Sequence, residues 1–180
     1  DMEDLEKIVK EVPESAKKLA SVYWPGPLTM IFQKSDIVPY ETTGGMDTVA
    51  VRMPDHPLAQ ALIRAGGGYV AAPSANTSGR PSPTMASHVE EDLDGKIDMI
   101  LDGGPVGIGL ESTIVDFTEE IPTILRPGHI IKNMIEPKDF TLSIYDNLSI
   151  YKKVEKINNK QGSNFSISFG DADNSIYKDS

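Results

Sequence analysis

The sequence predicts an α/β domain built on a twisted sheet. Two observations lead to this prediction: apolar residues recur at helical spacing in several stretches, and short runs rich in β-branched residues lie between those stretches. The runs are bounded by turns that contain Pro or Gly. With 180 residues, of which 39% are hydrophobic, the chain is long enough to bury a core of its own.

Four helices are expected from the periodicity of apolar residues and from helix boundary signals. Apolar residues at helical spacing predict two helices within residues 5–20, separated by Pro13, which suits the first position of the second helix. The stretch 56–66 has the same periodicity and ends with a glycine. Ser82 followed by a proline is typical of an N-cap and a first helical position, so a fourth helix is expected to run to about Leu93.

Six strands are expected from short apolar and β-branched runs. The run TVAVRM ends before a proline, and YVAA is short and apolar enough for a buried strand. After about residue 130 the composition becomes rich in Ser, Asn, Lys and Asp, so residues 1–130 are interpreted as the folded domain and 131–180 as a linker or tail of unknown role. The expected strands span residues 28–33, 48–53, 69–72, 97–102, 112–117 and 122–126.

The charge of the chain limits the partners that it can have. Its 27 acidic and 17 basic residues give a formal net charge of −10, and the acidic excess lies within residues 1–130. Such a surface repels a phosphate backbone, which argues against an extended nucleic-acid interface. A local pocket for one nucleotide, or a weak RNA contact, remains compatible with this charge.

Missing residue types exclude further classes of site. The chain has no cysteine, which rules out disulfides, thiolate catalysis and cysteine metal sites, and which fits a cytoplasmic protein. Its three histidines lack the spacing of metal ligands, so no protein metal site is expected. No apolar run approaches 18 residues, so no membrane partner is expected.

The polar loop 73–79, PSANTSG, is the first candidate site. Small side chains let a backbone approach a ligand closely, and hydroxyl and N–H groups suit phosphate oxygens. The loop lacks the GK[ST] ending of a P-loop, however. From composition alone, a surface turn is the somewhat better interpretation, with a phosphate site as the alternative.

Arg52 is the second candidate, because it ends an apolar run in which an unpaired guanidinium would be costly to bury. Its planar fork of donors suits a carboxylate or a phosphate. A structural ion pair with one of the many acidic residues explains the arginine equally well.

Two further segments carry weaker signals. In GIGLEST, two glycines precede Ser112 at the start of an expected strand, where the hydroxyl can bond a small polar ligand or the glycines can simply form a turn. Arg126 ends the last expected strand, before Pro and Gly, and by itself indicates little.

Six segments, taken in order, resemble one known family. WPGPLT, TVAVRMPDHP, AAPSANTSGRPSPT, ILDGG, GLESTIVD and ILRPG occur here in the order and near-spacing of the YrdC-like threonylcarbamoyl-AMP synthases. The match runs from about residue 5 to 130, and six ordered segments are far more specific than any one of them. The resemblance implies a YrdC-like fold, in which a twisted mixed sheet with flanking helices surrounds a deep cleft.

The resemblance also implies an activity. The family forms L-threonylcarbamoyladenylate and pyrophosphate from L-threonine, bicarbonate and ATP, for threonylcarbamoyladenosine modification of tRNA, so a nucleotidyltransferase is expected. Mg²⁺ is expected as the partner of ATP, and a tRNA threonylcarbamoyl transferase as the acceptor of the product. No catalytic side chain is implied, because positioning and charge neutralisation can supply the effect.

Matching motifs carry the family's binding roles onto this sequence. Threonine contacts are implied at Arg52, Ala72 and Ser112. ATP contacts are implied at Thr48, Ser74, Asn76, Ser82 and Arg126, with Asn76 on the phosphate side.

The sequence departs from the family pattern at both ends. The family's domain begins upstream with a PT-x-T-VYGL-like segment and a K-x-R-like motif, and neither occurs here, so the domain is expected to lack its N-terminal part. The SPGM-x-Y-x-HYAP-like linker of longer members is not recognisable in 131–180. The alternatives are an RNA-binding YrdC-like module without synthase activity and an inactive fragment. A hydrogenase-maturation carbamoyltransferase would add zinc-finger segments, for which a chain without cysteine has no basis.

Overall fold

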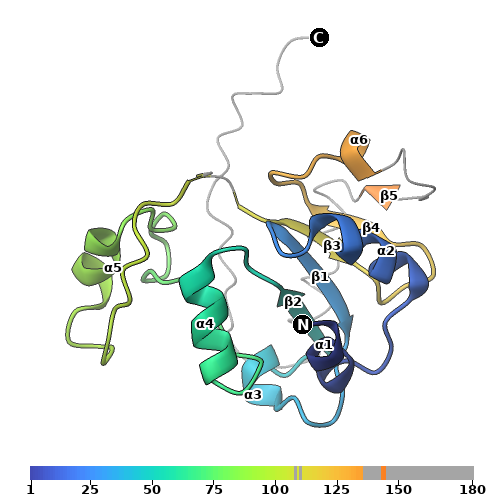
Figure 1. The fold of residues 1–180 in the computed structure, drawn as a ribbon, viewed down its shortest axis with the longest axis horizontal. Helices are drawn as coiled ribbons and strands as arrows, with labels where there is room; N and C mark the ends of the chain where they lie inside the picture. Colours follow the sequence, from blue (N-terminus) through green and yellow to red (C-terminus); the bar gives the residue numbers. More distant parts are fainter. Residues whose placement is uncertain (108, 110, 136–142, 145–180) are drawn as a thin grey trace. The chain divides into compact units, whose positions relative to one another are not determined.

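The computed structural model describes residues 1–107, 109, 111–135 and 143–144 (Figure 1). Helices and a mixed sheet make up these residues, which confirms the predicted α/β class. The chain divides into two compact units: unit 1 joins Asp1–Ala71 to Leu110–Lys152, and unit 2 contains Ala72–Gly109. The predicted domain boundary at residue 130 stays a prediction, because most of the residues after it lie outside the described part.

The sheet of unit 1 has the strand order β2-β1-β3-β4-β5 (Figure 1). β1 (Leu28–Gln33) pairs antiparallel with β2 (Thr48–Arg52) and parallel with β3 (Thr113–Asp116). β4 (Thr123–Arg126) pairs antiparallel with β3 and parallel with β5 (Ser143–Ile144). The strands predicted at 28–33, 48–53, 112–117 and 122–126 are therefore confirmed, with small differences at their ends.

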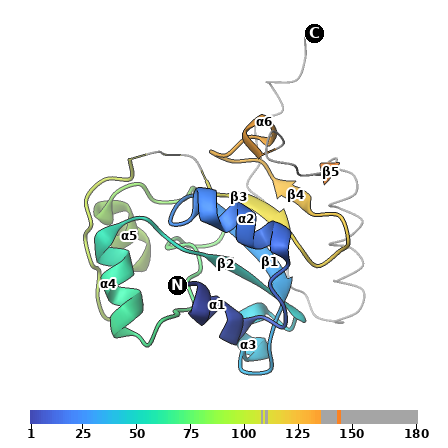
Figure 2. The same ribbon diagram turned by 45° about the vertical axis from the view of Figure 1, so that its right-hand side comes forward.

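The core of unit 1 lies between one face of the sheet and the helices α1 (Met2–Ile8) and α2 (Glu14–Tyr23) (Figure 2). A capping box begins α1, in which the Asp1 side chain accepts from the Asp4 backbone N–H at 2.9 Å. The second helix begins directly after Pro13, which is its N-cap rather than its first residue. The buried side chains of this core include Leu5, Ile8, Val9, Ala16, Leu19, Ala20, Leu28, Met30, Phe32, Val115 and Ile124.

Local contacts fix the turns at the start of β1 and of the helix predicted at 56–66. The Trp24 Nε1 donates to the Leu28 carbonyl at 2.7 Å, and the indole packs against the core. The His56 side chain accepts from the Leu58 N–H at 3.2 Å and so caps the predicted helix. The other helices in the described part of unit 1 are α3 (Tyr40–Thr43), α4 (Pro57–Ala65) and α6 (Lys132–Ile135).

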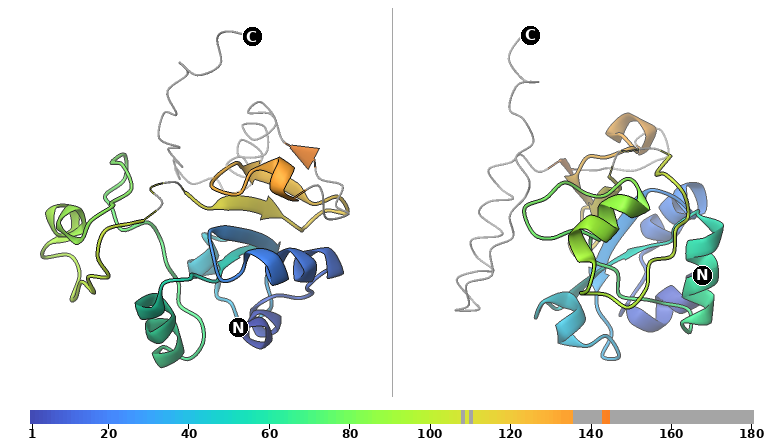
Figure 3. Two further views of the ribbon diagram at one scale, coloured as in Figure 1. Left: turned by 45° about the horizontal axis from the view of Figure 1, so that its top comes forward. Right: turned by 90° about the vertical axis from the view of Figure 1, so that its left-hand side faces the viewer.

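Unit 2 contains α5 (Ala86–Leu93) and otherwise irregular backbone in its described residues (Figure 3). The helix predicted from Ser82 begins later, with Met85 as its N-cap. The Thr84 carbonyl accepts from the Val106 N–H at 2.9 Å, so the backbone before α5 is bonded to a distant loop instead of to a helical turn. No helix in the described part of the chain is long and apolar enough to cross a membrane.

Two predicted strands are wrong. Residues 69–72 and 97–102 take no part in any sheet, and their apolar side chains are largely exposed, with Met99 at 72%. A strand needs a neighbour that satisfies its backbone groups and a packed face, and neither run has one among the described residues.

Candidate functional site

The register of the sheet aligns four residues in a row across unit 1. Thr29 of β1 lies opposite Arg52 of β2 and beside Ile114 of β3, and Ile114 pairs with Arg126 of β4. Paired residues project to the same side of a sheet, and the register of β3 and β4 shifts between Ile114 and Val115, so Arg126 pairs with Ile114 although Ile124 is in the core. The four side chains of the row therefore share one face. The strand neighbour Leu28 is fully buried on the other side, so the row lies on the face opposite the core.

Ser112 joins this row through hydrogen bonds to two of its members. Its Oγ lies 2.8 Å from the Thr29 Oγ1 and accepts from the Arg126 Nη2 at 3.2 Å. The Ser112 carbonyl also accepts from the Nε and Nη2 of Arg126, at 3.2 and 3.0 Å. Arg126 is therefore docked against the segment that leads into β3.

Glu111 holds the other edge of the Arg126 guanidinium. The Glu111 Oε2 lies 2.6 Å from the Arg126 Nη1. The two side chains are 56% and 38% exposed, so the ion pair contributes little to stability. The ion pair instead fixes the orientation of the Arg126 guanidinium, because together with the Ser112 bonds it holds this group in one place at the end of β4.

Arg52 differs from Arg126 in that it is exposed and has no bonded partner among the described residues. Its guanidinium makes no hydrogen bond or ion pair within the residues that the structure describes. The structural ion pair that the sequence left open is not formed among these residues, and an exposed guanidinium has the donor geometry that suits an anionic ligand. Thr48 lies on the same face of β2, because it is an even number of residues from Arg52.

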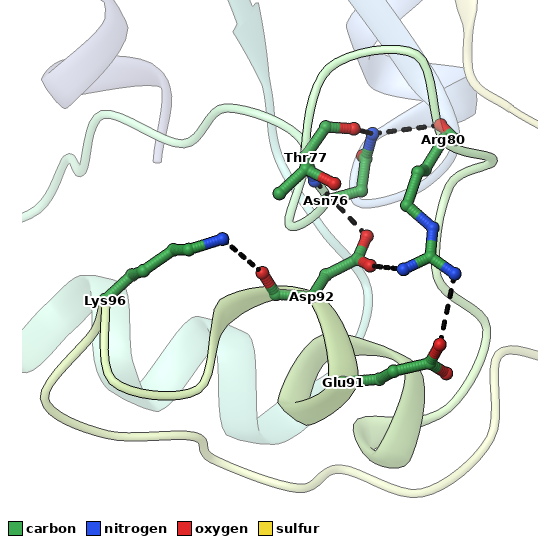
Figure 4. Close-up of polar contacts among 6 residues, drawn as sticks. All are labelled: Asn76, Thr77, Arg80, Glu91, Asp92 and Lys96. Atoms are coloured by element: carbon green, nitrogen blue, oxygen red, sulfur yellow. Dashed lines mark hydrogen bonds and ion pairs between the residues drawn. The ribbon is translucent and has the colours of Figure 1, made fainter.

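In unit 2, the loop 72–80 is fastened to α5 by Asp92, which is 8% exposed (Figure 4). One Asp92 oxygen accepts from the Thr77 N–H at 3.2 Å, and the other forms an ion pair with the Arg80 Nη1. The Arg80 Nη2 also contacts Glu91 at 3.1 Å. The hydrogen bond to Glu91, followed by the charges of Asp92 and Glu91, raises the pKa of Arg80, so this arginine stays charged.

Asn76 lies inside this loop and uses its amide on the loop itself. Its Nδ2 donates to the carbonyls of Thr77 and Arg80, both at 3.0 Å (Figure 4). The Oδ1 is buried and has no hydrogen-bond partner in the described part of the chain. An amide nitrogen has two N–H groups, so a bond from this nitrogen to a phosphate would require one of the two loop bonds to break.

The structure places the predicted site residues in two sets. Ala72, Ser74 and Ser82 are exposed on irregular backbone of unit 2, where Asn76 also lies. The deep cleft implied by the family resemblance stays a prediction. The second set lies on the face of the unit 1 sheet that is opposite the core, or at the edge of that sheet, and consists of Thr48, Arg52, Ser112 and Arg126.

A small concavity of unit 2 contains none of these residues. Its volume is about 220 Å³. Three carboxylates line it, so it repels phosphate and does not suit a nucleotide. No group of three or more His, Asp or Glu side chains among the described residues could hold a metal ion. The lining residues are Glu90, Asp94, Ile97, Asp98, Met99 and Ile100.

The chain matches one known protein family over most of its length. Residues 1–128 match the model of the Sua5/YciO/YrdC family, which is described by the words "telomere recombination". The chain belongs to this family. The relationship inferred from the six ordered segments is therefore confirmed.

Members of the Sua5/YciO/YrdC family with curated names resemble this chain closely. The threonylcarbamoyl-AMP synthase of Pyrococcus abyssi is 55% identical over 134 residues, which are 74% of this chain and 39% of the relative. That of Bacillus subtilis is 55% identical over 137 residues, 76% of this chain and 40% of the relative. The chain thus spans about two fifths of the length of these relatives.

A solved structure of the Sua5/YciO/YrdC family has the same fold. The structure of P. abyssi Sua5 complexed with L-threonine matches with a TM-score of 0.77 and 41% sequence identity. The match covers 89% of this chain and 56% of that chain. The predicted YrdC-like fold, a mixed sheet with flanking helices, is thereby confirmed.

The residues of the arrangement that were not singled out from the sequence include Thr29, Arg80 and Asp92. The sequence does contain a signal for Thr29, because strand alternation places this residue on the face opposite Leu28 and Met30. Arg80 and Asp92 are twelve residues apart and share no local pattern. Only the packing of the loop on α5 brings them together.

Proposed function

We propose that this chain provides the L-threonine and ATP contacts of a threonylcarbamoyl-AMP synthase, a nucleotidyltransferase. The observation that carries the proposal is the row in which the guanidinium groups of Arg52 and Arg126 flank the hydroxyls of Thr29 and Ser112. Two cations around two hydroxyls suit ligands that present a carboxylate, a hydroxyl and phosphates. The likeness to synthases at 55% identity, and to a Sua5 structure complexed with L-threonine, supports the same assignment.

The proposed roles follow from the charge and freedom of each side chain. Arg52, which has no bonded partner among the described residues, binds the threonine carboxylate as a fork, and Ser112 bonds a further polar atom of threonine. Arg126, held by Glu111 and Ser112, presents its charge and its remaining Nη1 hydrogen to ATP. The other proposed contacts are Ala72 for threonine, and Thr48, Ser74, Asn76 and Ser82 for ATP.

The proposed reaction proceeds in two steps that need no protein nucleophile. The threonine amine forms a C–N bond with the carbon of bicarbonate, which releases water and leaves a carbamate. A carbamate oxygen then forms a bond to the α-phosphorus of ATP, and pyrophosphate leaves as its bond to that phosphorus breaks. The chain's part is to orient the two substrates and to neutralise charge, with Mg²⁺ arriving on ATP.

The proposal also includes the destination of the product. We place the reaction in the cytoplasm, where a tRNA threonylcarbamoyl transferase takes up the adenylate. The net charge of −10 argues against a large RNA surface on this chain itself.

Pyrophosphate release tests the proposed function directly. We expect release that depends on L-threonine, bicarbonate and ATP together, measured with the chain and with the longest reading frame that contains it. Mass spectrometry should find threonylcarbamoyladenylate as the second product. Release that is unchanged when threonine or bicarbonate is left out would refute a synthase.

Replacing Arg52 by alanine is expected to weaken L-threonine binding about 10- to 100-fold, because a hydrogen-bonded charge is worth about 1.5–3 kcal/mol. ATP affinity should change much less. Calorimetry with each ligand measures both, with Arg64→Ala as a control that removes the same charge from the exposed surface of α4. Equal losses for the two ligands would contradict the carboxylate role.

A further inference from the structure

We propose that Thr29 is a positioning residue of this site, which holds the Ser112 hydroxyl so that its hydrogen points to an oxygen of the amino-acid ligand. The inference rests on the proposed function, since it takes L-threonine as the ligand. Thr29 stands in the middle of the sheet row, opposite Arg52 and within 2.8 Å of the Ser112 Oγ. It is partly buried, on a face that otherwise carries both arginines of the site.

What each group can donate fixes the direction of the bond between Arg126 and Ser112, and the proposal assigns the donor role in the other bond to Thr29. A guanidinium has only donors, so the bond from the Arg126 Nη2 occupies one acceptor position of the Ser112 Oγ. A serine hydroxyl has two acceptor positions and one hydrogen. When Thr29 donates across the 2.8 Å contact, both acceptor positions of Ser112 are filled. The Ser112 hydrogen is then the one group of this hydroxyl that is left for a ligand.

Such a hydroxyl discriminates between the polar groups of an amino acid. A hydroxyl whose acceptor positions are filled can bond a carboxylate or hydroxyl oxygen, and it cannot accept from an ammonium group. Threonine offers both kinds of oxygen beside its amine. Thr29 therefore favours a binding mode in which Ser112 donates to an oxygen and leaves the amine, the nucleophile of the proposed reaction, unbonded by Ser112.

The surroundings of Thr29 keep its hydroxyl in place. β1 is paired on both sides, with β2 and with β3, so the Thr29 backbone is held in the sheet interior. A β-branched side chain in a strand has few χ1 rotamers, which limits where Oγ1 can go. On the Ser112 side, the next residue is fixed by a reciprocal pair of bonds between the Thr113 Oγ1 and the backbone of Ile130, at 2.7 and 3.0 Å. Little reorganisation is then needed on binding.

A double-mutant cycle between Thr29→Val and Ser112→Ala tests the inference. Thr29→Val keeps the shape and removes the hydroxyl, and we expect L-threonine to bind roughly 3- to 10-fold more weakly, the effect of one neutral hydrogen bond. Thr29→Ser should bind nearly as the unsubstituted chain does. In the Ser112→Ala background, Thr29→Val should add nothing, because its effect passes through the lost hydroxyl. Thr42→Val, which removes an exposed hydroxyl of the same unit, is the matched control.

Melting temperatures of the same variants give a readout that does not depend on any ligand. If the two hydroxyls are bonded, the Tm changes of Thr29→Val and Ser112→Ala are not additive in the double variant. Additive changes would overturn the proposal, as would unchanged threonine affinity in Thr29→Val or an equal loss in the Ser112→Ala background. Failure of the unsubstituted chain to bind L-threonine would instead overturn the proposed function, and the positioning role for that ligand would fall with it.

Discussion

Replacing Gly128 by alanine is expected to destabilise unit 1 by about 1–3 kcal/mol, the usual cost of forcing an extra group into a packed site. A Cβ at this position would lie 2.7 Å from both the Ser112 carbonyl carbon and the Thr113 backbone nitrogen. Both atoms belong to the backbone that leads into β3, so no flexible side chain can move aside. The turn at Gly128 must shift away from β3, and Arg126, two residues earlier, must shift with it.

The effect of Gly128→Ala should appear in stability and in binding together. We expect the Tm to fall by roughly 2–12 °C, a range that follows from the free-energy change and the size of the chain. L-threonine should also bind more weakly, because the shift of Arg126 breaks its hydrogen bonds to Ser112. Gly107→Ala is the matched control, since no atom lies within 4 Å of the added Cβ and its φ is not in the left-handed region. A Gly128→Ala protein that melts like the control would show that the turn does not pack tightly on β3.

Replacing Asp92 by alanine is expected to release the loop 72–80 from α5. The substitution leaves the Thr77 N–H without its acceptor and removes one of the two acidic partners of Arg80. Leaving such donors unpaired costs about 1–3 kcal/mol, and the cost falls on unit 2. Asp92→Asn keeps an oxygen for Thr77 and loses the ion pair, so we expect a smaller effect.

Hydrogen exchange measures the release of this loop at a single amide. The Thr77 amide should exchange faster in Asp92→Ala than in Asp92→Asn, and Asp94→Asn, which removes an exposed charge next to α5, should leave it unchanged. ATP affinity should fall in the same order, because the proposed contacts Ser74 and Asn76 lie on the released loop. Faster exchange with unchanged ATP affinity would contradict the assignment of this loop to ATP.

The elements that the sequence predicts well are those whose pattern is local and whose face is half-buried. β1 shows the alternation of buried and more exposed residues along Leu28–Gln33, and α4 ends where the glycine after it predicts. The family, too, follows from the sequence, because six ordered segments retain their residues and spacing. Those segments also identified the site residues Arg52, Ser112 and Arg126, for which local residue patterns alone gave only weak or ambiguous evidence.

The failures share one cause. YVAA at 69–72 and IDMILD at 97–102 have strand-like composition, but a strand exists only where a second strand accepts its backbone bonds. The helix after Ser82 begins late because a carbonyl before it is bonded to Val106, far along the chain. Composition and periodicity describe a segment and its immediate neighbours, so they do not record such distant partners.

The site therefore divides between what sequence alone determined and what only the tertiary structure decided. The sequence by itself determined which residue types stand at strand ends and in the polar loop. The sheet register decided that Arg52, Thr29 and Arg126 share one face, and loop packing decided that Asp92 holds Arg80. Register is a relation between strands, set by the burial of Leu28 and Met30 against the helices, because a shift of one residue would bury the arginines instead.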